Sequence, residues 1–529
     1  MLSSSRTYRR LLAGLILFWA IELLVLQQWT TLSDASIPMH DAIKDASRRF
    51  VLNLAGCTAL VCLFGRWSLR ATFVVGLVMT NLLVVYANYF GSPLSWPVLS
   101  SQWREGLAVS DHGMSLVDWR IVAISAIALA VKVAIANAVP SGTMSRHERR
   151  RVVAIAGGVY LAVAIGLAGF HKPLRRISLG TPEYVYGYVV AWAAEAISLD
   201  NGVLLEVALT KARGASNILS ETERTLLLTN NVAIIQVESL DFDVIESEVD
   251  GEAVMPFLRG IQGQAMLYCV KPYHFTGSSE ADFSMLTAAA PNGKVNPFQI
   301  QGFPYEQALP WLAQQQGYQA VAFHGNTGEF FHRRDAYEQM GFSDIYFTEE
   351  LEPLKVSGHW DRDLLEFSAD LMEASTAPTL HFVITITSHG PFDRLLESDR
   401  ELFEQPTNVQ QRYLNSMRYV DRVLENYIEQ LPMDTTVVLY GDHESNVHGY
   451  CEDERHPDRV PWLILQKGRD LSTRQDSRES GLALSGELSQ LDMACYFRNL
   501  LARTQIAASK ELKRRIANKP FYGQSTTKL

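Results

Sequence analysis

Cysteine is scarce in this chain, with five residues among 529. Cys57 and Cys62 lie in an apolar run, where we expect them to serve as packing residues. Cys269, Cys451 and Cys495 lie beyond the apolar runs, where a disulfide is permitted, but their spacing selects no pair. The cysteines therefore predict no disulfide framework, and pairing among the last three stays open.

Positive charge is also in deficit. The chain has 47 lysines and arginines against 57 aspartates and glutamates, which gives a net charge of −10. Affinity for nucleic acid depends on a positive field, so this balance argues against nucleic acid as a partner. Internal repeats and low-complexity tracts are absent as well. The length alone indicates more than one domain.

Long apolar runs, by contrast, are abundant but confined to the first 170 residues. A helix needs about 20 residues to cross a bilayer core. We therefore expect an α-helical transmembrane bundle of five spans, at residues 11–28, 50–65, 71–90, 121–140 and 152–170. Buried helices of a soluble protein are the alternative, but five such runs would need an unusually large core. The first run lacks a small-x-small cleavage site, so we interpret it as a retained anchor and not as a signal peptide.

Arginines predict the orientation of this bundle. They gather before the first span, between the second and third, and between the fourth and fifth: Arg6, Arg9, Arg10, Arg66, Arg70, Arg146, Arg149, Arg150 and Arg151. The other connections mix acidic and basic residues. The positive-inside rule puts the arginine-rich connections in the cytoplasm, and an odd number of spans then puts the rest of the chain outside it. We expect a multi-pass protein of the cell (inner) membrane with an extracytoplasmic, periplasmic second half.

The chain divides by composition into four parts. They are a transmembrane domain at 1–170, a juxtamembrane connector at 171–229, a large extracytoplasmic domain at 230–505 and a basic tail at 506–529. The connector holds aromatic residues of the types that settle at a membrane interface: Tyr184, Tyr186, Tyr188 and Trp192. These residues favour an amphipathic helix on the outer leaflet. An ordinary packed helix of the following domain is the alternative.

Short β-branched runs alternate with helical patterns from about residue 230 onward. The expected strands are 231–237, 265–270, 318–323, 380–387, 435–440 and 461–466. The expected helices are 254–264, 279–289, 305–316, 333–340, 361–375, 407–430 and 486–502. Alternation at this spacing predicts an α/β domain with a mainly parallel sheet and helices on both faces.

Four of these strands end in residues that can bind a metal or handle a phosphate. They are Glu238, His324, His389 and the pair Asp442-His443. In open α/β sheets the site forms beyond the carboxyl ends of the strands. Each residue taken singly has a structural interpretation, as a cap, a turn residue or a loop histidine. Their placement after separate strands is what favours an active site.

Three hydroxyls precede the helical pattern that starts near residue 279: Thr276, Ser278 and Ser279. The free N–H groups at a helix N-terminus favour an anion. By position Ser278 is the candidate nucleophile. A helix cap is the alternative role for Ser278 or Ser279, and this reasoning does not separate Ser278 from Thr276.

Six segments resemble, in order and spacing, the lipoteichoic-acid-synthase-like phosphoglycerol transferases of the alkaline phosphatase and sulfatase superfamily. They are NVAIIQVESL, TGSSEADF, FHGNTGEFFHRRDAYEQMGF, TITSHGPF, LYGDHES and SQLDMACYFRNLL. The resemblance implies a sulfatase-like catalytic domain at 230–505 behind the membrane anchor. Enzymes of this branch move phosphoglycerol or phosphoethanolamine from a phospholipid to a glycan or lipid acceptor through a covalent phospho-enzyme. The family usually has threonine as its nucleophile, where this chain has Ser278.

The resemblance also implies a role for each site residue. One divalent metal would be bound by Glu238, Ser278, Asp442 and His443. The substrate would be contacted by Arg333, Phe331, His389 and His324, and His389 would also protonate the leaving group. His456 is a further candidate. Two carboxylates, a hydroxyl and one imidazole suit Mn²⁺ best, with Zn²⁺ and Mg²⁺ as alternatives.

The function expected from these residues is metal-dependent transfer of phosphoglycerol from phosphatidylglycerol to a cell-envelope glycan or glycolipid, through a phosphoserine intermediate. A phosphoethanolamine transferase is the main rival, because Glu280, Glu329 and Asp335 could face an ammonium group. A non-catalytic lipid sensor is the second. A true sulfatase is disfavoured, because the segment after Ser278 lacks the proline and arginine of the C/S-x-P-x-R signature.

Overall fold

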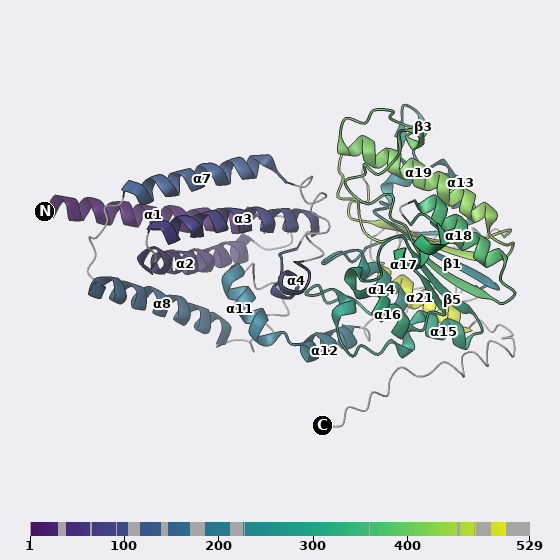
Figure 1. Cartoon of the computed structure of the whole chain (residues 1–529), viewed down its shortest axis with the longest axis horizontal. Coiled ribbons are helices and arrows are strands. Elements are labelled where there is room, and N and C mark those ends of the chain that lie inside the picture. The colour runs from purple at the N-terminus through teal and green to yellow at the C-terminus, as the bar shows by residue number, and fades with distance from the viewer. Residues whose placement is uncertain are drawn as a thin grey trace, which may run out of the picture. The chain divides into compact units, whose positions relative to one another are not determined.

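The structure is a computed structural model, shown in Figure 1. It describes residues 2–29, 39–63, 66–90, 92–103, 117–138, 146–169, 183, 186–211, 226, 228–358, 360–451, 455–469, 471 and 488–503. The chain forms two compact units, Met1–Leu204 and Leu205–Leu529. Tyr184, the expected basic tail and 29 of the 59 residues of the expected connector lie outside the described residues.

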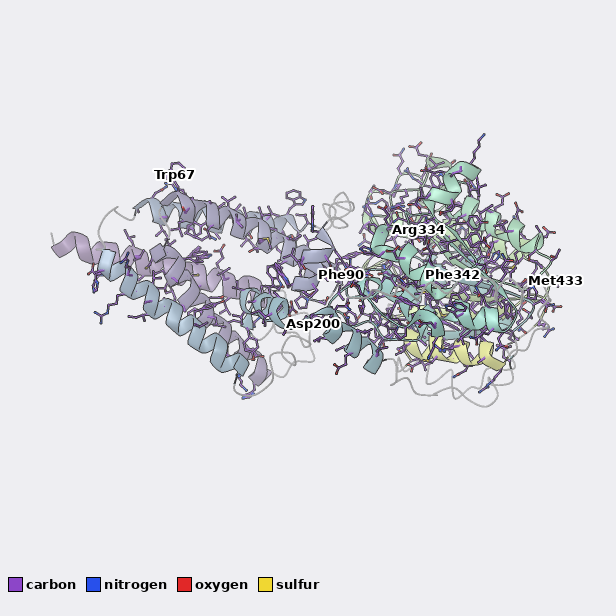
Figure 2. The ribbon with its side chains drawn as sticks, turned by 60° about the horizontal axis from the view of Figure 1, so that its bottom comes forward. Trp67, Phe90, Asp200, Arg334, Phe342 and Met433 are labelled. Carbon is purple, nitrogen blue, oxygen red and sulfur yellow. The ribbon has the colours of Figure 1, made fainter. Side chains whose placement is uncertain are left out.

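The first unit is helical. Five long helices fall on the five predicted runs: α1 (Leu2–Trp29), α2 (Met39–Leu63), α3 (Arg66–Phe90), α7 (Trp119–Ala138) and α8 (Arg146–Gly169). Within this unit α2 packs against α8 and α1, while α7 packs against α3 and α1. Apolar side chains remain exposed on the outside of the bundle, and Trp67 at the start of α3 is 81% exposed (Figure 2).

Two of these helices are long and apolar enough to cross a membrane within the described part of the chain. They are the stretches Trp67–Ala87 of α3 and Trp119–Ala138 of α7. A third candidate is a pair bent by 89°, made of α11 (Tyr188–Ser198) and the start of α12 (Asn201–Lys211). The helices α1, α2 and α8 are not in this set, so the five predicted spans are not confirmed.

A buried ion pair joins two helices of this unit. Lys132 on α7 lies 2.5 Å from the Glu22 carboxylate on α1, and both side chains are almost fully buried. The Lys132 ammonium also lies 5.2 Å from the centre of the Phe73 ring on α3. A charge inside an apolar bundle needs a partner. The Glu22 charge, which makes α1 less apolar, is therefore compensated within the bundle.

The aromatic residues of α11 pack inward. The short helix α4 (Trp96–Ser101) lies against α11, where the Trp192 indole N–H donates to the Leu94 carbonyl at 2.8 Å. Tyr188 is buried, and the side chains most exposed on α11 are Val189 and Ile197. The exposed large apolar side chains of this helix are thus aliphatic, and its placement at a membrane interface stays a prediction.

The second unit contains a seven-stranded sheet of order β4-β9-β8-β1-β7-β5-β6. Its strands are β1 (Asn231–Val237), β4 (Met266–Val270), β5 (Gln319–His324), β6 (Asp344–Tyr346), β7 (Thr379–Ile384), β8 (Thr435–Gly441) and β9 (Val460–Gln466). Among these seven strands, β9 runs antiparallel to the other six, so its pairings with β4 and β8 are the antiparallel ones. The central strands are buried on both faces, which explains their continuous apolar runs. The mainly parallel sheet is confirmed.

Helices cover both faces of this sheet (Figure 1). One layer consists of α13 (Pro256–Ile261), α18 (Asp361–Glu373) and α19 (Val409–Gln430). The other consists of α14 (Ser279–Thr287), α15 (Leu309–Gln315), α16 (Arg333–Met340) and α21 (Gln490–Arg503). The sequence prediction missed β6, which has three residues, and the small hairpin β2 (Glu248–Val249) with β3 (Glu252–Ala253).

The strand predicted at 380–387 ends earlier than expected, at Ile384. The Asp361 carboxylate accepts hydrogen bonds from the backbone N–H groups of Ile386 and Thr387, at 2.7 and 3.0 Å. These bonds replace the sheet ladder and turn the chain into a loop that carries His389. Burial raises the pKa of Asp361 to about 6, against the opposing effect of these hydrogen bonds.

Candidate active site

The predicted strand ends meet at one edge of the sheet. Strands β1 and β8 pair in parallel with Val237 opposite Gly441, so Glu238 and Asp442 follow neighbouring strands at the same level. His443 comes next, and its ring Nε2 lies 3.2 Å from Glu238 Oε1. The carboxylate and imidazole ligand atoms of these three residues all lie within 4.8 Å of one another. All three side chains are buried.

One carboxylate oxygen of this cluster has no hydrogen bond. Asp442 Oδ1 accepts from the backbone N–H groups of Ser239 and His443, both at 2.8 Å. Asp442 Oδ2 is buried and accepts no hydrogen bond among the described residues. An orphaned buried carboxylate oxygen is costly unless something binds it. Its position beside a second carboxylate and an imidazole fits a divalent cation.

The charges at this cluster depend on one another. Burial and the negative charge of Glu238 hold the pKa of Asp442 well above its usual range. The pKa of Glu238 is lowered despite its burial, because His389 and His443 stabilise its charge. The pKa of His443 is raised to about 10: burial opposes the rise, and the carboxylates of Asp442 and Glu238 drive it. The two buried carboxylates therefore favour a positive charge at the position between them.

Ser278 lies against this cluster. Its Oγ is 3.4 Å from Glu238 Oε2 and 3.3 Å from His443 Nε2. The residue stands at the N-cap of α14, yet its side chain makes no capping hydrogen bond. Ser278 is half-buried, and it lies at the N-terminus of α14, where the helix dipole favours an anion.

The two rival hydroxyls are engaged elsewhere. Ser279 is fully buried and its Oγ accepts a hydrogen bond from the Asn296 amide. Thr276 is buried and donates to Glu280 Oε1 at 3.1 Å. The structure therefore brings Ser278, and neither neighbour, to Glu238 and His443 by hydrogen-bond contact.

Phe331 closes over the turn that precedes Ser278. Gly277 has φ of +144°, and a Cβ placed on it would meet the Phe331 ring at 2.6 Å. Phe331 and His332 both have φ of 59°, in the left-handed region that side chains rarely adopt. Strain of this kind persists only where the surrounding structure enforces it, and it concentrates at functional sites.

Arg333 is held from two sides. Its Nε donates to Asp282 Oδ2 at 2.9 Å, and its Nη1 lies 3.4 Å from His324 Nε2. The guanidinium carbon is 5.4 Å from the centre of the Phe331 ring. Tyr337 donates a second hydrogen bond to the same oxygen of Asp282, at 2.7 Å. These contacts fix the direction of the guanidinium.

His324 lies behind Arg333. Burial and the adjacent guanidinium lower the pKa of His324 to about 3. A neutral imidazole that receives Arg333 at Nε2 must carry its proton on Nδ1, which lies 3.3 Å from the Ile384 carbonyl. This geometry favours a supporting role for His324 over direct contact with substrate.

His389 follows β7 on the loop that Asp361 holds. Its Nδ1 lies 2.8 Å from the Gly390 carbonyl, which directs the other ring nitrogen elsewhere. The preceding Ser388 donates to the Glu238 carbonyl at 2.7 Å, so this loop is tied to the strand end beside it. His389 also lies close enough to Glu238 to lower its pKa.

Two site features were missed in the sequence. The ring of His274 stacks on His443, with ring centres 3.8 Å apart and planes at 5°. His274 is buried, and burial together with His443 holds its pKa well below the usual range. Gln490 donates to the carbonyls of Gly441 and Asp442, at 2.8 and 2.7 Å. The sequence signal that could have identified His274 is its position two residues before the TGSS segment.

His456, by contrast, is not part of the cluster of Glu238, Asp442 and His443. Its Nδ1 is 2.6 Å from Asp243 Oδ1, and its ring packs on Phe242 with centres 5.0 Å apart. The contacts are those of a histidine that holds two loops together.

Comparisons with known proteins agree on the second unit. Residues 230–482 match the family model described as Sulfatase. Lipoteichoic acid synthase 2 of Bacillus subtilis is 25% identical in an alignment of length 448, which covers 77% of this chain and 66% of that relative. A lipoteichoic acid synthase of Staphylococcus aureus is 28% identical over 254 residues, 45% of this chain and 38% of that relative. The chain thus spans less than two thirds of either relative.

One solved structure resembles nearly the whole chain in fold. It is the integral membrane lipooligosaccharide phosphoethanolamine transferase A from Neisseria meningitidis, with a TM-score of 0.54 and 13% identity. The match covers 95% of this chain and 97% of that one. At this identity the likeness is one of fold, and it includes the helical region.

Proposed function

We propose that the protein transfers a phosphoglycerol group, because residues 230–482 match the family model described as Sulfatase. The donor is phosphatidylglycerol, and the acceptor is a cell-envelope glycan or glycolipid. The relatives named as lipoteichoic acid synthases support a phosphoryl-group transferase. The observation that carries the proposal is the contact of Ser278 with Glu238 and His443 at the N-terminus of α14.

Glu238, Ser278, Asp442 and His443 would hold one divalent metal, with Mn²⁺ favoured and Zn²⁺ or Mg²⁺ as alternatives. The orphaned Oδ2 of Asp442 supports this ligand set. A bound metal supplies a Lewis acid that favours the alkoxide form of a hydroxyl at neutral pH.

The reaction proceeds in two displacements. In the first, Ser278 Oγ gives its proton to solvent and bonds to the donor phosphorus, while the bond from phosphorus to the diacylglycerol oxygen breaks. His389 gives a proton to that oxygen, and Arg333 with the N-terminus of α14 offsets the charge on the phosphoryl oxygens. In the second, an acceptor hydroxyl gives its proton to His389 and bonds to phosphorus, while the bond from phosphorus to Ser278 Oγ breaks and Ser278 regains a proton from solvent. The apolar helices of the first unit would keep the acyl chains of the donor in the bilayer.

The carboxylates that could bind an ammonium headgroup give little support to the rival function, a phosphoethanolamine transferase. Glu280 is fully buried and accepts hydrogen bonds from Thr276, so its charge holds the turn before Ser278. Glu329 and Asp335 are exposed. A non-catalytic sensor is disfavoured because the ligand set and Ser278 remain together. Phosphoglycerol is therefore the favoured group.

The test supplies full-length protein with Mn²⁺ and labelled phosphatidylglycerol or phosphatidylethanolamine, and measures diacylglycerol. We expect release from phosphatidylglycerol, and a decrease of about 10³-fold or more in Ser278→Ala, which loses the nucleophile. Ser279→Ala is the matched control: it should keep activity and lose about 1–3 kcal/mol of stability, because the Asn296 amide loses its acceptor. Release only from phosphatidylethanolamine would establish the rival, and release from neither would favour the sensor.

A further inference from the structure

A short turn after β7 carries His389. The His389 backbone N–H donates to the Ile386 carbonyl at 3.1 Å, so residues 386–389 form this turn. Because β7 has already ended at Ile384, contacts from other elements set the direction of the turn. Whatever fixes the turn therefore also fixes the point from which the His389 side chain projects.

Asp361 holds the first two residues of this turn. It is the first residue of α18 and is 1% exposed. One carboxylate oxygen accepts from the Ile386 N–H at 2.7 Å, and the other accepts from the Thr387 N–H at 3.0 Å. In return, the Asp361 N–H donates to Thr387 Oγ1 at 3.1 Å. Hydrogen bonds to an ionised acceptor are about twice as strong as those between neutral groups, so this tie between α18 and the turn is firm.

The other side of the turn is tied to Glu238 at the end of β1. Ser388 Oγ donates to the Glu238 carbonyl at 2.7 Å, and the Glu238 N–H donates to Thr385 Oγ1 at 3.0 Å. The residues just before His389 are therefore fixed between α18 and the end of β1. Such precision matters for a group that must reach a reacting atom, because a misplacement of about 1 Å can cost about 10²-fold in rate.

We infer that Asp361 is a positioning residue for the first displacement and that it acts through His389. The inference rests on the proposed function, in which His389 gives its proton to the diacylglycerol oxygen as the bond from that oxygen to phosphorus breaks. Asp361 contacts the turn and is not among the proposed ligands of the metal or the phosphate. Its removal should therefore impair proton transfer to the leaving oxygen and spare the attack by Ser278.

The leaving group provides the test, because His389 is needed only when the departing oxygen requires a proton. Diacylglycerol leaves as an alcohol and requires one, whereas para-nitrophenolate is a stable anion that leaves without one. The two probes are phosphatidylglycerol in detergent micelles and the para-nitrophenyl ester of glycerol phosphate. Full-length protein with Mn²⁺ is kept in excess of either probe, so that each release reports a single first displacement.

Asp361→Asn keeps the shape of the side chain but turns an amide NH₂ toward one of the two backbone N–H groups. We expect the ratio of para-nitrophenolate release to diacylglycerol release to rise about 10²-fold, because only the second rate falls. Thr387→Val removes the acceptor of the Asp361 N–H and should raise the ratio by less. Equal losses of both releases in Asp361→Asn would overturn the inference. If that variant does not fold, an unchanged ratio in Thr387→Val would overturn it.

Asp421 on α19 offers a matched control. It is 2% exposed, and its two carboxylate oxygens accept from the N–H groups of Phe257 and Leu258, at 2.8 and 2.9 Å. Burial raises the pKa of Asp361 and of Asp421 alike, to about 6. The two donors belong to α13, which supplies none of the proposed site residues. Asp421→Asn should therefore lose comparable stability in urea unfolding and keep the wild-type ratio. A rise as large as that in Asp361→Asn would contradict a specific role for Asp361.

His389→Ala distinguishes failure of this inference from failure of the proposed function. It should raise the ratio as Asp361→Asn does, and the double variant should raise it no further, because both changes remove the same contribution. A raised ratio in His389→Ala with an unchanged ratio in Asp361→Asn would refute the Asp361 inference alone. An unchanged ratio in His389→Ala would refute the role of His389 and the inference with it. If wild-type protein releases neither product, the proposed function itself fails.

Discussion

At the scale of single residues, the site joins two buried carboxylates, and the ion-pair partner that both contact among the described residues is His443, whose charge depends on protonation. Glu238 and Asp442 lie beside His443, and Asp442 Oδ2 lacks a hydrogen bond among the described residues. Removal of a bound metal should therefore destabilise the protein as well as inactivate it. A ligand present at 100 times its Kd contributes about 2.7 kcal/mol, which a chelator removes.

The measurement is the melting temperature with and without chelator, together with the metal content of protein purified without added metal. We expect a lower melting temperature after chelation, recovered by Mn²⁺, and no response in Asp442→Ala. Stoichiometric zinc would refute manganese as the first choice. An unchanged melting temperature would refute the metal site itself.

Two adjacent arginines of α16 allow a matched comparison. Arg333 is buried and pairs with the fully buried Asp282. Arg334 is partly exposed and pairs with Glu349 and Glu350 near the surface (Figure 2). Removal of one partner from a buried pair leaves an uncompensated charge and costs about 3–5 kcal/mol. Loss of a surface pair costs about 0–1 kcal/mol.

Arg333→Ala should therefore lower the unfolding free energy by several kcal/mol and remove activity, while Arg334→Ala should change both little. Urea unfolding and diacylglycerol release measure the two effects. Arg333→Lys keeps the charge without the planar fork and should recover stability better than activity. Equal effects of the two alanine variants would show that the Asp282 contact has no special role.

The rule that parallel strands end at one edge of a sheet predicted part of the site, and the structure shows the contacts between its residues. It predicted Glu238 and Asp442 because parallel strands end at one edge. Reasoning from the helix N-terminus did not separate Ser278 from Thr276, since that distinction depends on the hydrogen bond that the Thr276 hydroxyl donates to Glu280. It missed His274, because the stacking of this ring on His443 joins loops 169 residues apart in the sequence.

At the scale of elements, the turn before α14 depends on glycine for two reasons. Gly277 has a φ that side chains rarely adopt, and the Phe331 ring occupies the place of a Cβ. Gly277→Ala should therefore suffer both backbone strain and a clash. Gly251, in the β2–β3 hairpin, has φ of +85°, and a Cβ added to it would meet no described atom within 4 Å.

Gly251→Ala isolates the backbone strain, about 1–2 kcal/mol. Gly277→Ala should cost more, and adding Phe331→Ala should restore part of the difference, because the ring that clashes is gone. Thermal unfolding of these variants, with Phe331→Ala alone as the reference, gives the comparison. A Gly277→Ala variant as stable as Gly251→Ala would contradict the close approach of Phe331.

Elements with regular patterns were predictable, and those fixed by distant contacts were not. The helix α19 shows a clear apolar face and was predicted at nearly its observed bounds. The early end of β7 was not, because Asp361 on another element takes over its hydrogen bonds. The reversed direction of β9 was also not predicted, since an apolar run looks the same in either direction.

At the scale of the whole molecule, the number of membrane crossings decides where the active site works. Trp67 lies at the start of α3, and Glu252 lies in the second unit. Five spans place three crossings between these positions, namely α3, α7 and α8, so the two residues face opposite sides. With α3 and α7 alone, both residues would face the same side. The arginine-rich connection at Arg66 and Arg70 should be cytoplasmic.

Single cysteines introduced as Trp67→Cys and Glu252→Cys test this, because both sites are exposed. The parent carries Cys451→Ser and Cys495→Ser, which removes the two native cysteines that are not buried. A membrane-impermeant maleimide applied to cells with an opened outer layer should label the Glu252→Cys variant and spare the Trp67→Cys variant, and both should react after detergent lysis. Labelling of both variants in unlysed cells would mean an even number of crossings between the two positions. If the Glu252→Cys variant were spared in unlysed cells and labelled only after lysis, the second unit would lie on the cytoplasmic side, and an outer-face transferase would be untenable.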